Sequence, residues 1–279
     1  MREFRFVITP FCNYRCFFCH GESACKQIDL MLKPSDYEFL GQVGKNMGWN
    51  TATITGGEPL ISPIFPSVTE RLNNLGIGLT VVTNASLLAR PQETLKNVKQ
   101  LNVSLHTLNP ETYAKIVQVK YPLEKVLSTI VTTRALLPNL IIHLNYTVIK
   151  GLNDSAQDFE NLLRFAREVK AEAKFIDLST TDKDIATDTD EIIEQLQSLG
   201  FAIKEQDAWQ YHLSRGSEKV RVTKCPFNGK HNDLPTRDIF VDSDGTLYKS
   251  YGGYFGINVL NEIKSRDEKS LVQKMQVLF

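Results

Sequence analysis

The amino-acid sequence predicts an α/β protein built as a partial (β/α)6 TIM-like barrel with a C-terminal β-hairpin/helix cap. Short β-branched runs alternate with helical patterns six times, and each crossover helix returns the chain in the same direction, so parallel strands are expected. Polar and metal-binding residue types follow the ends of successive strands, where barrel enzymes gather their sites. From about residue 201 the pattern changes to short strands and turns, which predicts the cap.

The first four units lie in the first half of the chain. Alternating or continuous apolar runs mark the strands, and apolar residues at helical spacing mark the helices. Pro34 and Ser35 open the first helix after a cysteine-containing loop. The expected strands are 3–9, 51–55, 79–83 and 101–105, and the expected helices are 34–48, 63–75, 91–97 and the segments PETYAKIVQ and LEKVLSTIVTTRAL.

Two further units and the cap follow. The expected strands are 140–149 and 173–178, each followed by a helix, over 155–169 and 189–200. DSDGT, residues 242–246, predicts a hairpin turn, and a closing helix is expected near 261–277. No linker-like composition divides the chain, so we expect a barrel over 1–200 and a capping extension over 201–279 in one globular unit.

Composition limits the functional classes. The 279 residues are 42% hydrophobic, and 32 basic residues balance 32 acidic ones, so no polymeric nucleic acid or membrane partner is expected. The N-terminus lacks a signal-peptide pattern and no apolar run is long enough to cross a membrane, which predicts a cytoplasmic protein. In a reducing compartment the five cysteines are expected to be metal ligands or free thiols.

Three of those cysteines stand close together in CNYRCFFC, as Cys12, Cys16 and Cys19. Zinc would take a fourth ligand, for which His20 and Cys25 are the nearest candidates, whereas a four-iron cluster can leave one iron open. The motif GGEP, Gly56 to Pro59, follows the second strand. Its two glycines allow close backbone approach and its Glu58 carboxylate can bind an ammonium group, which favours an amino-acid-like ligand beside the metal.

CNYRCFFC and GGEP together resemble the CxxxCxxC and methionine-binding motifs of the radical S-adenosylmethionine (radical SAM) superfamily. The resemblance implies that Cys12, Cys16 and Cys19 bind one [4Fe-4S] cluster, whose open iron chelates SAM beside Gly56, Gly57, Glu58 and Pro59. It also implies reductive cleavage of SAM to a 5'-deoxyadenosyl radical that abstracts hydrogen from the substrate. Phe18 corresponds to an aromatic residue near the adenine, although ordinary core packing is the competing interpretation.

Further segments, LNVSLHTLNPETYAKI, LNYTVIKGLND and TNASLL, are similar to MoaA, the GTP 3',8-cyclase branch, from residue 3 to about 180. This similarity implies that Gly57, Ser104 and Ser179 contact SAM. It further implies that Arg5, Thr83 and Lys150 contact the substrate. For Arg5 and Lys150 a solvated surface position is an equally simple interpretation.

The C-terminal third departs from that branch. The segment TRDIF, with Arg237, replaces the arginine-rich phosphate-binding segment, and Ser250 stands where a ligand of the branch's second cluster is expected. Thr53 replaces an arginine, and the chain ends in KMQVLF without the two terminal glycines of the branch. Cys225 alone cannot hold a second cluster. GTP cyclisation is therefore not expected.

The leading interpretation is a radical SAM enzyme acting on a small molecule, with nucleotides as first candidates and an electron donor such as flavodoxin or ferredoxin. Modification of a peptide is the alternative within the superfamily, and a non-catalytic zinc-binding module is the alternative outside it. Cys225 is a candidate hydrogen-atom donor, although a buried free cysteine is the commoner role for such a residue.

Overall fold

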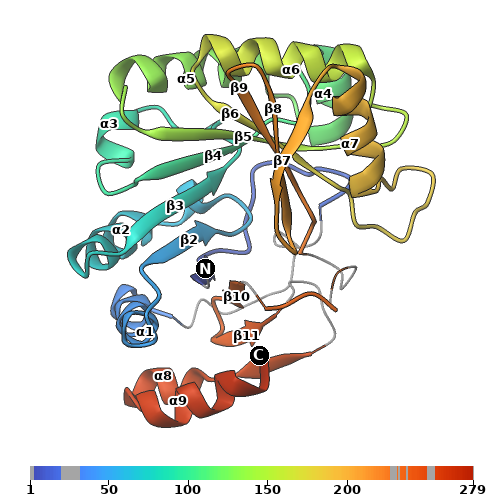
Figure 1. The fold of residues 1–279 in the computed structure, drawn as a ribbon. Helices are drawn as coiled ribbons and strands as arrows, with labels where there is room; N and C mark the ends of the chain where they lie inside the picture. Colours follow the sequence, from blue (N-terminus) through green and yellow to red (C-terminus); the bar gives the residue numbers. More distant parts are fainter. Residues whose placement is uncertain are drawn as a thin grey trace.

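The computed structural model describes residues 3–19, 32–226, 231, 233–236, 238–249 and 255–278. The candidates His20, Cys25, Arg237 and Ser250 lie outside these residues. A curled sheet carries helices on its outer side, as Figure 1 shows. None of the helices in the described ranges is long and apolar enough to cross a membrane.

Six parallel strands form the centre of the sheet in chain order. They are β1 (Glu3–Val7), β2 (Thr51–Thr55), β3 (Gly78–Thr83), β4 (Gln100–Ser104), β5 (Ile141–Thr147) and β6 (Glu172–Ile176). Parallel pairing holds throughout this set. The predicted partial barrel is confirmed.

The helices that connect these strands begin close to the expected positions. They are α1 (Pro34–Asn46), α2 (Phe65–Asn74), α3 (Pro91–Thr94), α4 (Pro110–Val117), α5 (Leu123–Leu136), α6 (Ala156–Glu168) and α7 (Thr189–Ser198), with a 3-10 turn η1 (Pro59–Ile61) before α2. Asn109 caps α4 and Ser155 caps α6 by accepting backbone N–H groups. Proline at the first position opens α1, α3 and α4.

The C-terminal segment extends both edges of the sheet. Its strands are β7 (Ala202–Gln206), β8 (Gln210–Arg215), β9 (Glu218–Thr223), β10 (Asp238–Val241), β11 (Thr246–Tyr248) and β12 (Gly256–Asn258). In the described residues β9 joins β6 and β10 joins β1, both in parallel, giving the order β12-β11-β10-β1-β2-β3-β4-β5-β6-β9-β8-β7. The predicted hairpin turn connects β10 to β11.

The expected closing helix is two helices, α8 (Leu260–Ser265) and α9 (Glu268–Met275), followed by a 3-10 turn η2 (Gln276–Leu278). Arg266 ends α8 with φ of 60°, a conformation that cannot continue a helix. Lys264 and Arg266 form ion pairs with the buried Asp36 at the start of α1. These ion pairs tie the C-terminal helices to α1.

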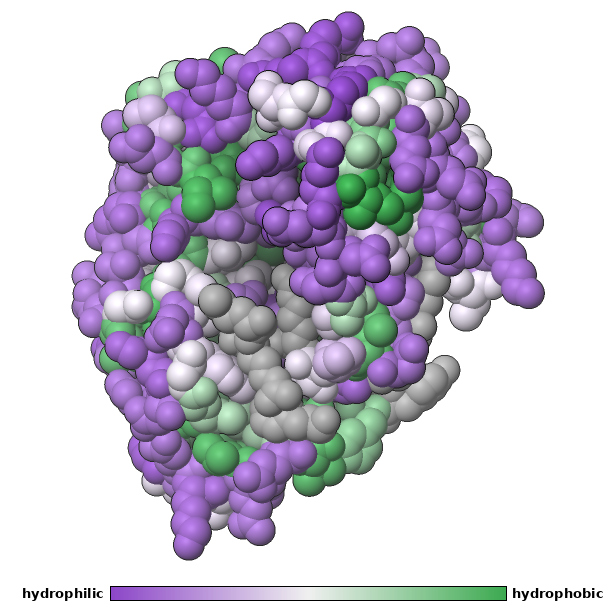
Figure 2. Space-filling view, in the orientation of Figure 1, coloured by the Kyte–Doolittle hydropathy of each residue, from purple (hydrophilic) through white to green (hydrophobic). Residues whose placement is uncertain are grey.

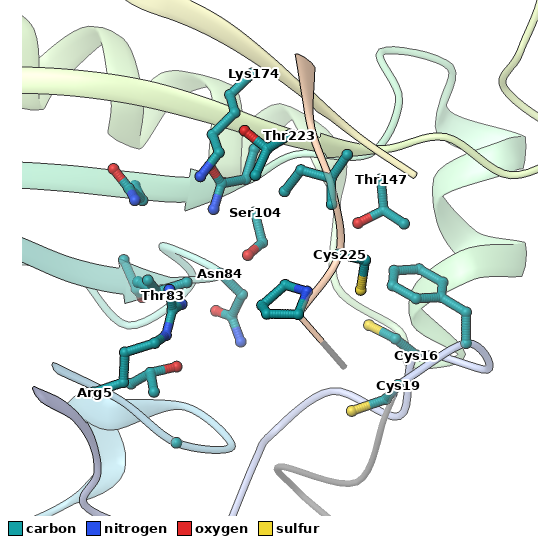
Figure 3. Close-up of a pocket in the computed structure, with 18 of the residues that line it drawn as sticks. Arg5, Cys16, Cys19, Thr83, Asn84, Ser104, Thr147, Lys174, Thr223 and Cys225 are labelled. Carbon is teal, nitrogen blue, oxygen red and sulfur yellow. The ribbon is translucent and has the colours of Figure 1, made fainter. Parts of the chain in front are cut away.

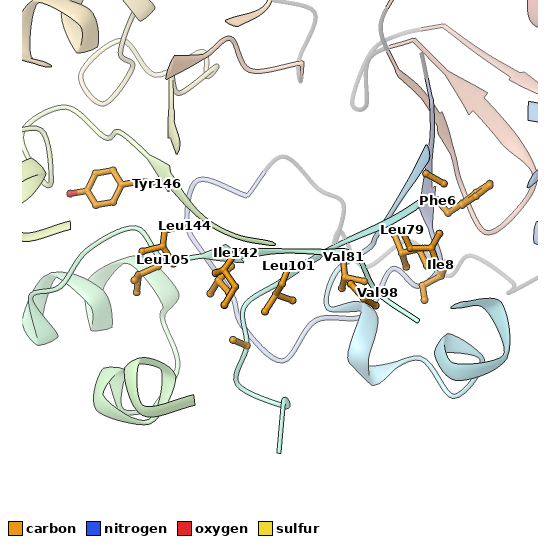
Figure 4. Packing of buried hydrophobic residues seen from close by; sticks show 14 of the residues in the cluster. Phe6, Ile8, Leu79, Val81, Val98, Leu101, Leu105, Ile142, Leu144 and Tyr146 are labelled. Atoms are coloured by element: carbon orange, nitrogen blue, oxygen red, sulfur yellow. The ribbon is translucent and has the colours of Figure 1, made fainter. Parts of the chain in front are cut away.

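The strands divide their side chains strictly between two faces. Apolar side chains such as Phe6, Leu79, Leu101 and Leu144 pack outward in one large core, part of which Figure 4 shows. The alternate residues point inward, and most of them are polar: Arg5, Asn102, Ser104, Asn145, Thr147, Lys174, Thr223 and Asp238. The inner face is therefore suited to binding a polar molecule, whereas the outer face supplies the core.

Candidate functional site

A cavity of about 220 Å³ lies inside the curve of the sheet at the carboxyl ends of its strands. Cys12, Cys16 and Cys19 line it together with the inward side chains of β1, β4, β5, β6 and β9. Figure 3 shows sulfur atoms at one end of this cavity and Lys174 at the other, and Figure 2 shows hydrophilic side chains around the hollow in this face. The geometry brings three thiols and a polar chamber into one site.

The cysteine loop, residues 10–19, is held from two sides. Its backbone N–H groups at Arg15 and Phe17 donate to the carbonyls of Val117 and Ile116 at the end of α4, at 3.0 and 3.2 Å. On the other side the N–H of Glu58 donates to the Phe11 carbonyl at 2.8 Å. The cysteine spacing and the GGEP motif are thus parts of one hydrogen-bonded structure.

Both glycines of GGEP sit where a side chain would not fit. Gly56 has a φ of 156°, and an added Cβ would lie 2.5 Å from the Thr9 carbonyl oxygen. At Gly57 the corresponding distance to the Phe11 carbonyl oxygen is 2.3 Å. Both residues line the cavity, so their backbone groups are accessible to a ligand beside the thiols.

The sequence analysis expects the Glu58 carboxylate to bind a ligand ammonium group, but the structure places this carboxylate outside the cavity. Its side chain is fully buried and accepts hydrogen bonds from Thr83 Oγ1 at 2.7 Å, Asn84 N at 2.8 Å and Leu60 N at 3.0 Å. Burial raises the pKa of Glu58, and these hydrogen bonds oppose that increase. Glu58 joins the ends of β2 and β3 and does not line the cavity.

Glu58→Gln is expected to lower the free energy of unfolding by about 1 to 3 kcal/mol, because the amide NH2 would face groups that are themselves donors. Urea denaturation measures the loss. Glu93→Gln is the matched control, since Glu93 is 70% exposed and its replacement should change stability by under about 0.5 kcal/mol. Equal stability of the two variants would show that Glu58 does not brace the strand ends.

The surroundings of the three thiols bear on which metal group they fit. Cys12 and Cys16 are partly buried and Cys19 is exposed. Burial raises the pKa of Cys12 to about 11 and that of Cys16 to about 12, and nearby negative charge adds to the increase, from Glu58 and Cys19 at Cys12 and from the other two thiols at Cys16. Metal binding must therefore displace their protons. Within the described residues no three Cys, His, Asp or Glu side chains converge as ligands of a single ion. A four-iron cluster takes each thiolate on a different iron, so the three thiols fit that group.

The other sequence candidates divide into two groups. Phe18, Ser104, Thr83, Arg5 and Cys225 line the cavity. The Phe18 ring meets the His106 ring edge-on, with centroids 4.9 Å apart, and the Thr83 hydroxyl is engaged by Glu58. Arg5 lies 3.4 Å from Asp238 and over the Phe240 ring.

The second group lies elsewhere. Lys150 is half exposed and forms an ion pair with Glu191 at 2.9 Å, away from the cavity. Ser179 and Pro59 are buried and do not line it. Lys150 follows the end of β5 and Ser179 follows β6, so both lie beyond the last inward position of their strands.

Several cavity residues were not among those to which the sequence analysis assigned a contact with metal, SAM or substrate. Asn84 donates from its side-chain amide to Asn13 Oδ1 at 3.0 Å, between the cysteine loop and the end of β3. The remaining ones lie on β4, β5, β6 and β9 or follow them: Asn102, His106, Asn145, Thr147, Lys174 and Thr223. The sequence signal that could have identified these residues is the polar residue at every second position of the parallel strands. Such strands are usually apolar on both faces when helices cover them.

Known proteins resemble the chain in both sequence and fold. A probable GTP 3',8-cyclase of Pyrobaculum aerophilum is 31% identical over 98% of this chain and 91% of its own length. One of Thermococcus kodakarensis is 34% identical over 62% of this chain and 56% of its own. The crystal structure of Streptococcus suis SuiB bound to S-adenosylmethionine superimposes with a TM-score of 0.72 and 16% identity, covering 93% of this chain and 63% of SuiB.

A native anSMEcpe structure with bound AdoMet superimposes with a TM-score of 0.64 and 13% identity, covering 96% of this chain and 80% of that protein. Because these sequence identities are low, the two structures support a likeness of fold alone. The sequence profile of the radical SAM superfamily matches residues 6–166, a span that holds the three clustered cysteines, GGEP and the strands β2 to β5. With that match over more than half its length, the chain is a member of the radical SAM superfamily.

Proposed function

We propose that this enzyme binds one [4Fe-4S] cluster through Cys12, Cys16 and Cys19, together with SAM, and acts on a small molecule held inside the partial barrel. The observation that carries the proposal is the shared cavity: the three thiols, Gly56 and Gly57 of GGEP and the polar inner wall all line it. When bound, the cluster supplies the electron that cleaves SAM reductively, and the resulting radical abstracts hydrogen from the substrate.

The chain's own residues would hold SAM near the thiols. The backbone of Gly56 and Gly57 approaches the cysteine loop closely enough to receive the methionyl end. Ser104 offers a hydroxyl, and the Phe18 ring offers an apolar surface for the adenine. Glu58 and Pro59 are buried outside the cavity and hold the backbone that carries these groups. We assign no ligand contact to Lys150 or Ser179, because both lie away from the cavity.

Nucleotides remain the first substrates to test, because Arg5 lines the cavity and the named relatives are probable GTP cyclases. GTP cyclisation itself is disfavoured by the altered C-terminal sequence.

Cys225 is the only cysteine of that segment, and it is buried against the cavity, where its thiol could donate a hydrogen atom to a substrate radical. Peptide modification is the second candidate, since the fold also matches SuiB solved with its precursor peptide.

Anaerobic reconstitution tests the proposal. We expect about four irons per chain and 5'-deoxyadenosine that forms only with a low-potential reductant, either dithionite or a flavodoxin or ferredoxin. Deuterated nucleotides, supplied one at a time, should transfer deuterium into 5'-deoxyadenosine if they are substrates. Bound zinc with no SAM cleavage would contradict the proposal and support the zinc-binding alternative.

A further inference from the structure

Large apolar side chains are exposed on and around the cysteine loop, on the side that faces away from the cavity. Phe11 and Phe17 in the loop are 59% and 39% exposed, Ile61 is 37% exposed and Leu87 is 42% exposed. None of these four side chains lines the cavity. Single exposed apolar residues are ordinary on a protein surface, whereas several in one place indicate a surface that binds a partner.

Two of these side chains belong to one hydrogen-bonded structure. Glu58 N donates to the Phe11 carbonyl at 2.8 Å, and Ile61 N donates to the Glu58 carbonyl at 3.1 Å. The turn η1, which carries Ile61, is therefore held against the cysteine loop.

The other two side chains are held to the same loop from β3 and α4. Asn13 donates from its side chain to Ser86 Oγ at 2.8 Å, and Leu87 is the next residue. Phe17 N donates to the Ile116 carbonyl at 3.2 Å, near the end of α4. All four side chains thus lie on the cysteine loop or on segments bonded to it. They form the apolar surface of the loop: Phe11, Phe17, Ile61 and Leu87.

Basic side chains lie next to this apolar surface. Arg15 is in the cysteine loop, and its N–H donates to the carbonyl of Val117, close in sequence to Lys115 and Lys120. The side chains of Arg15, Lys115 and Lys120 are exposed, and within the described ranges no ion pair or hydrogen bond engages them. Their charges are therefore available to a partner.

The balance of charge is local to this side of the molecule. Residues 8–19, 59–64, 84–90 and 112–125 contain five basic residues and one acidic residue, Glu124, whereas the whole chain has 32 of each kind. Of the five, Arg90 is offset by Glu93 at 3.4 Å. The remaining excess of positive charge favours an acidic partner.

We propose that the apolar surface, together with Arg15, Lys115 and Lys120, is the docking site of an acidic electron-transfer protein. Apolar residues inside a charged rim are typical of protein interfaces, and the rim steers a partner of opposite charge. Two copies of this chain meeting here would bring the same basic side chains against one another, which disfavours self-association through this surface.

The position of the surface suits electron transfer, and this argument rests on the proposed function. The surface includes the loop that carries Cys12, Cys16 and Cys19, yet its apolar side chains lie outside the cavity. A carrier bound here lies close to the thiols and leaves the substrate chamber open. It would give up one electron to the group that the thiols hold and would itself be oxidised by one electron, with no atom transferred.

Calorimetric titration of the anaerobically reconstituted protein with an oxidised, acidic flavodoxin tests the docking site. Wild-type protein should bind the flavodoxin, and binding should weaken about tenfold or more between about 50 and about 300 mM salt, because exposed charges are screened. The double variant Lys115→Glu/Lys120→Glu should weaken binding at least about tenfold at the lower salt concentration. Leu87→Ser should weaken it several-fold at both concentrations, since it removes apolar contact.

A second double variant, Lys204→Glu/Lys219→Glu, is the matched control. It reverses two exposed lysines on β7 and β9, which several strands of the sheet separate from β1, and it should bind flavodoxin as the wild type does. Equal losses in the two double variants, or no wild-type binding at about 50 mM salt, would overturn the proposal. Tighter binding of oligothymidine than of flavodoxin, lost in Lys115→Glu/Lys120→Glu, would assign the surface to nucleic acid and would also overturn it.

The reductant separates docking from SAM chemistry. Dithionite-driven formation of 5'-deoxyadenosine should be the same in Lys115→Glu/Lys120→Glu and wild-type protein, because neither lysine lines the cavity. With reduced flavodoxin, the KM for flavodoxin should rise about tenfold or more in that variant. Flavodoxin binding without SAM cleavage under either reductant would contradict the proposed function alone. SAM cleavage with dithionite but no flavodoxin binding would contradict the docking site alone.

Discussion

Cys16→Ala is expected to abolish cluster binding, with iron falling from about four to below about one per chain and 5'-deoxyadenosine formation falling below about 1% of the wild-type rate. Cys16 lines the cavity, and its backbone carbonyl also accepts from Cys19 N at 3.0 Å, so it is central to the loop. In the proposed cluster, loss of one of the three thiolates would leave an iron without its protein ligand. Iron analysis and the charge-transfer absorbance of the reconstituted variant measure the effect.

Cys225→Ala is the matched control, because Cys225 is a buried thiol that lines the same cavity. It should keep its iron and its substrate-free SAM cleavage. Retention of four irons by Cys16→Ala would exclude Cys16 as a ligand, and loss of iron in Cys225→Ala would make that residue part of the metal site. The two variants together decide which thiols hold the metal.

Gly57→Ala is expected to reduce SAM cleavage about a hundredfold or more. The added Cβ would lie 2.3 Å from the Phe11 carbonyl oxygen and 2.8 Å from Cys12 N, both of them backbone atoms. Neither can move aside without displacing the cysteine loop, and a shift near 1 Å at a reacting centre is enough for a loss of this size. The variant should also disturb the bond from Glu58 N to the Phe11 carbonyl.

Gly78→Ala provides the comparison, because its added Cβ would meet its nearest neighbour, the Lys99 side chain, at an ordinary 3.6 Å. We expect its iron content and SAM cleavage rate to stay within about twofold of the wild type. Both rates are measured as dithionite-dependent 5'-deoxyadenosine at saturating SAM. A Gly57→Ala enzyme as active as Gly78→Ala would mean that the close approach of GGEP to the cysteine loop is not needed.

The strand-helix alternation was readable from the sequence because local patterns determine it. The six central strands and their helices lie where apolar periodicity and proline or asparagine caps predict them. The positions of β9 and β10 were not predictable in this way, because pairing with β6 and β1 depends on contacts between distant segments. A pattern of short strands specifies a hairpin but not the sheet edge that it joins.

The site residues were predictable from the sequence where a motif fixes the backbone conformation. They were less predictable where their role depends on the direction in which a side chain points. Cys12, Cys16, Cys19, Gly56 and Gly57 all reach the cavity. Lys150 and Ser179 match family positions in sequence, yet the first meets Glu191 at the surface and the second is buried elsewhere. Near a strand end, a shift of one residue reverses the side of the sheet that a side chain faces.

The edges of the sheet also bear on how the chain folds during synthesis. β1, which begins at Glu3, pairs on one side with β10, which begins at Asp238. At the other edge of the central strands, β6 has no neighbour on its outer side until β9 has been synthesised. Parallel strands with exposed edges are slow to form and prone to pair wrongly until their neighbours arrive. Residues up to Val241 must therefore leave the ribosome before the walls of the cavity can be completed, so we expect the proposed cluster to be loaded only after these residues have been synthesised.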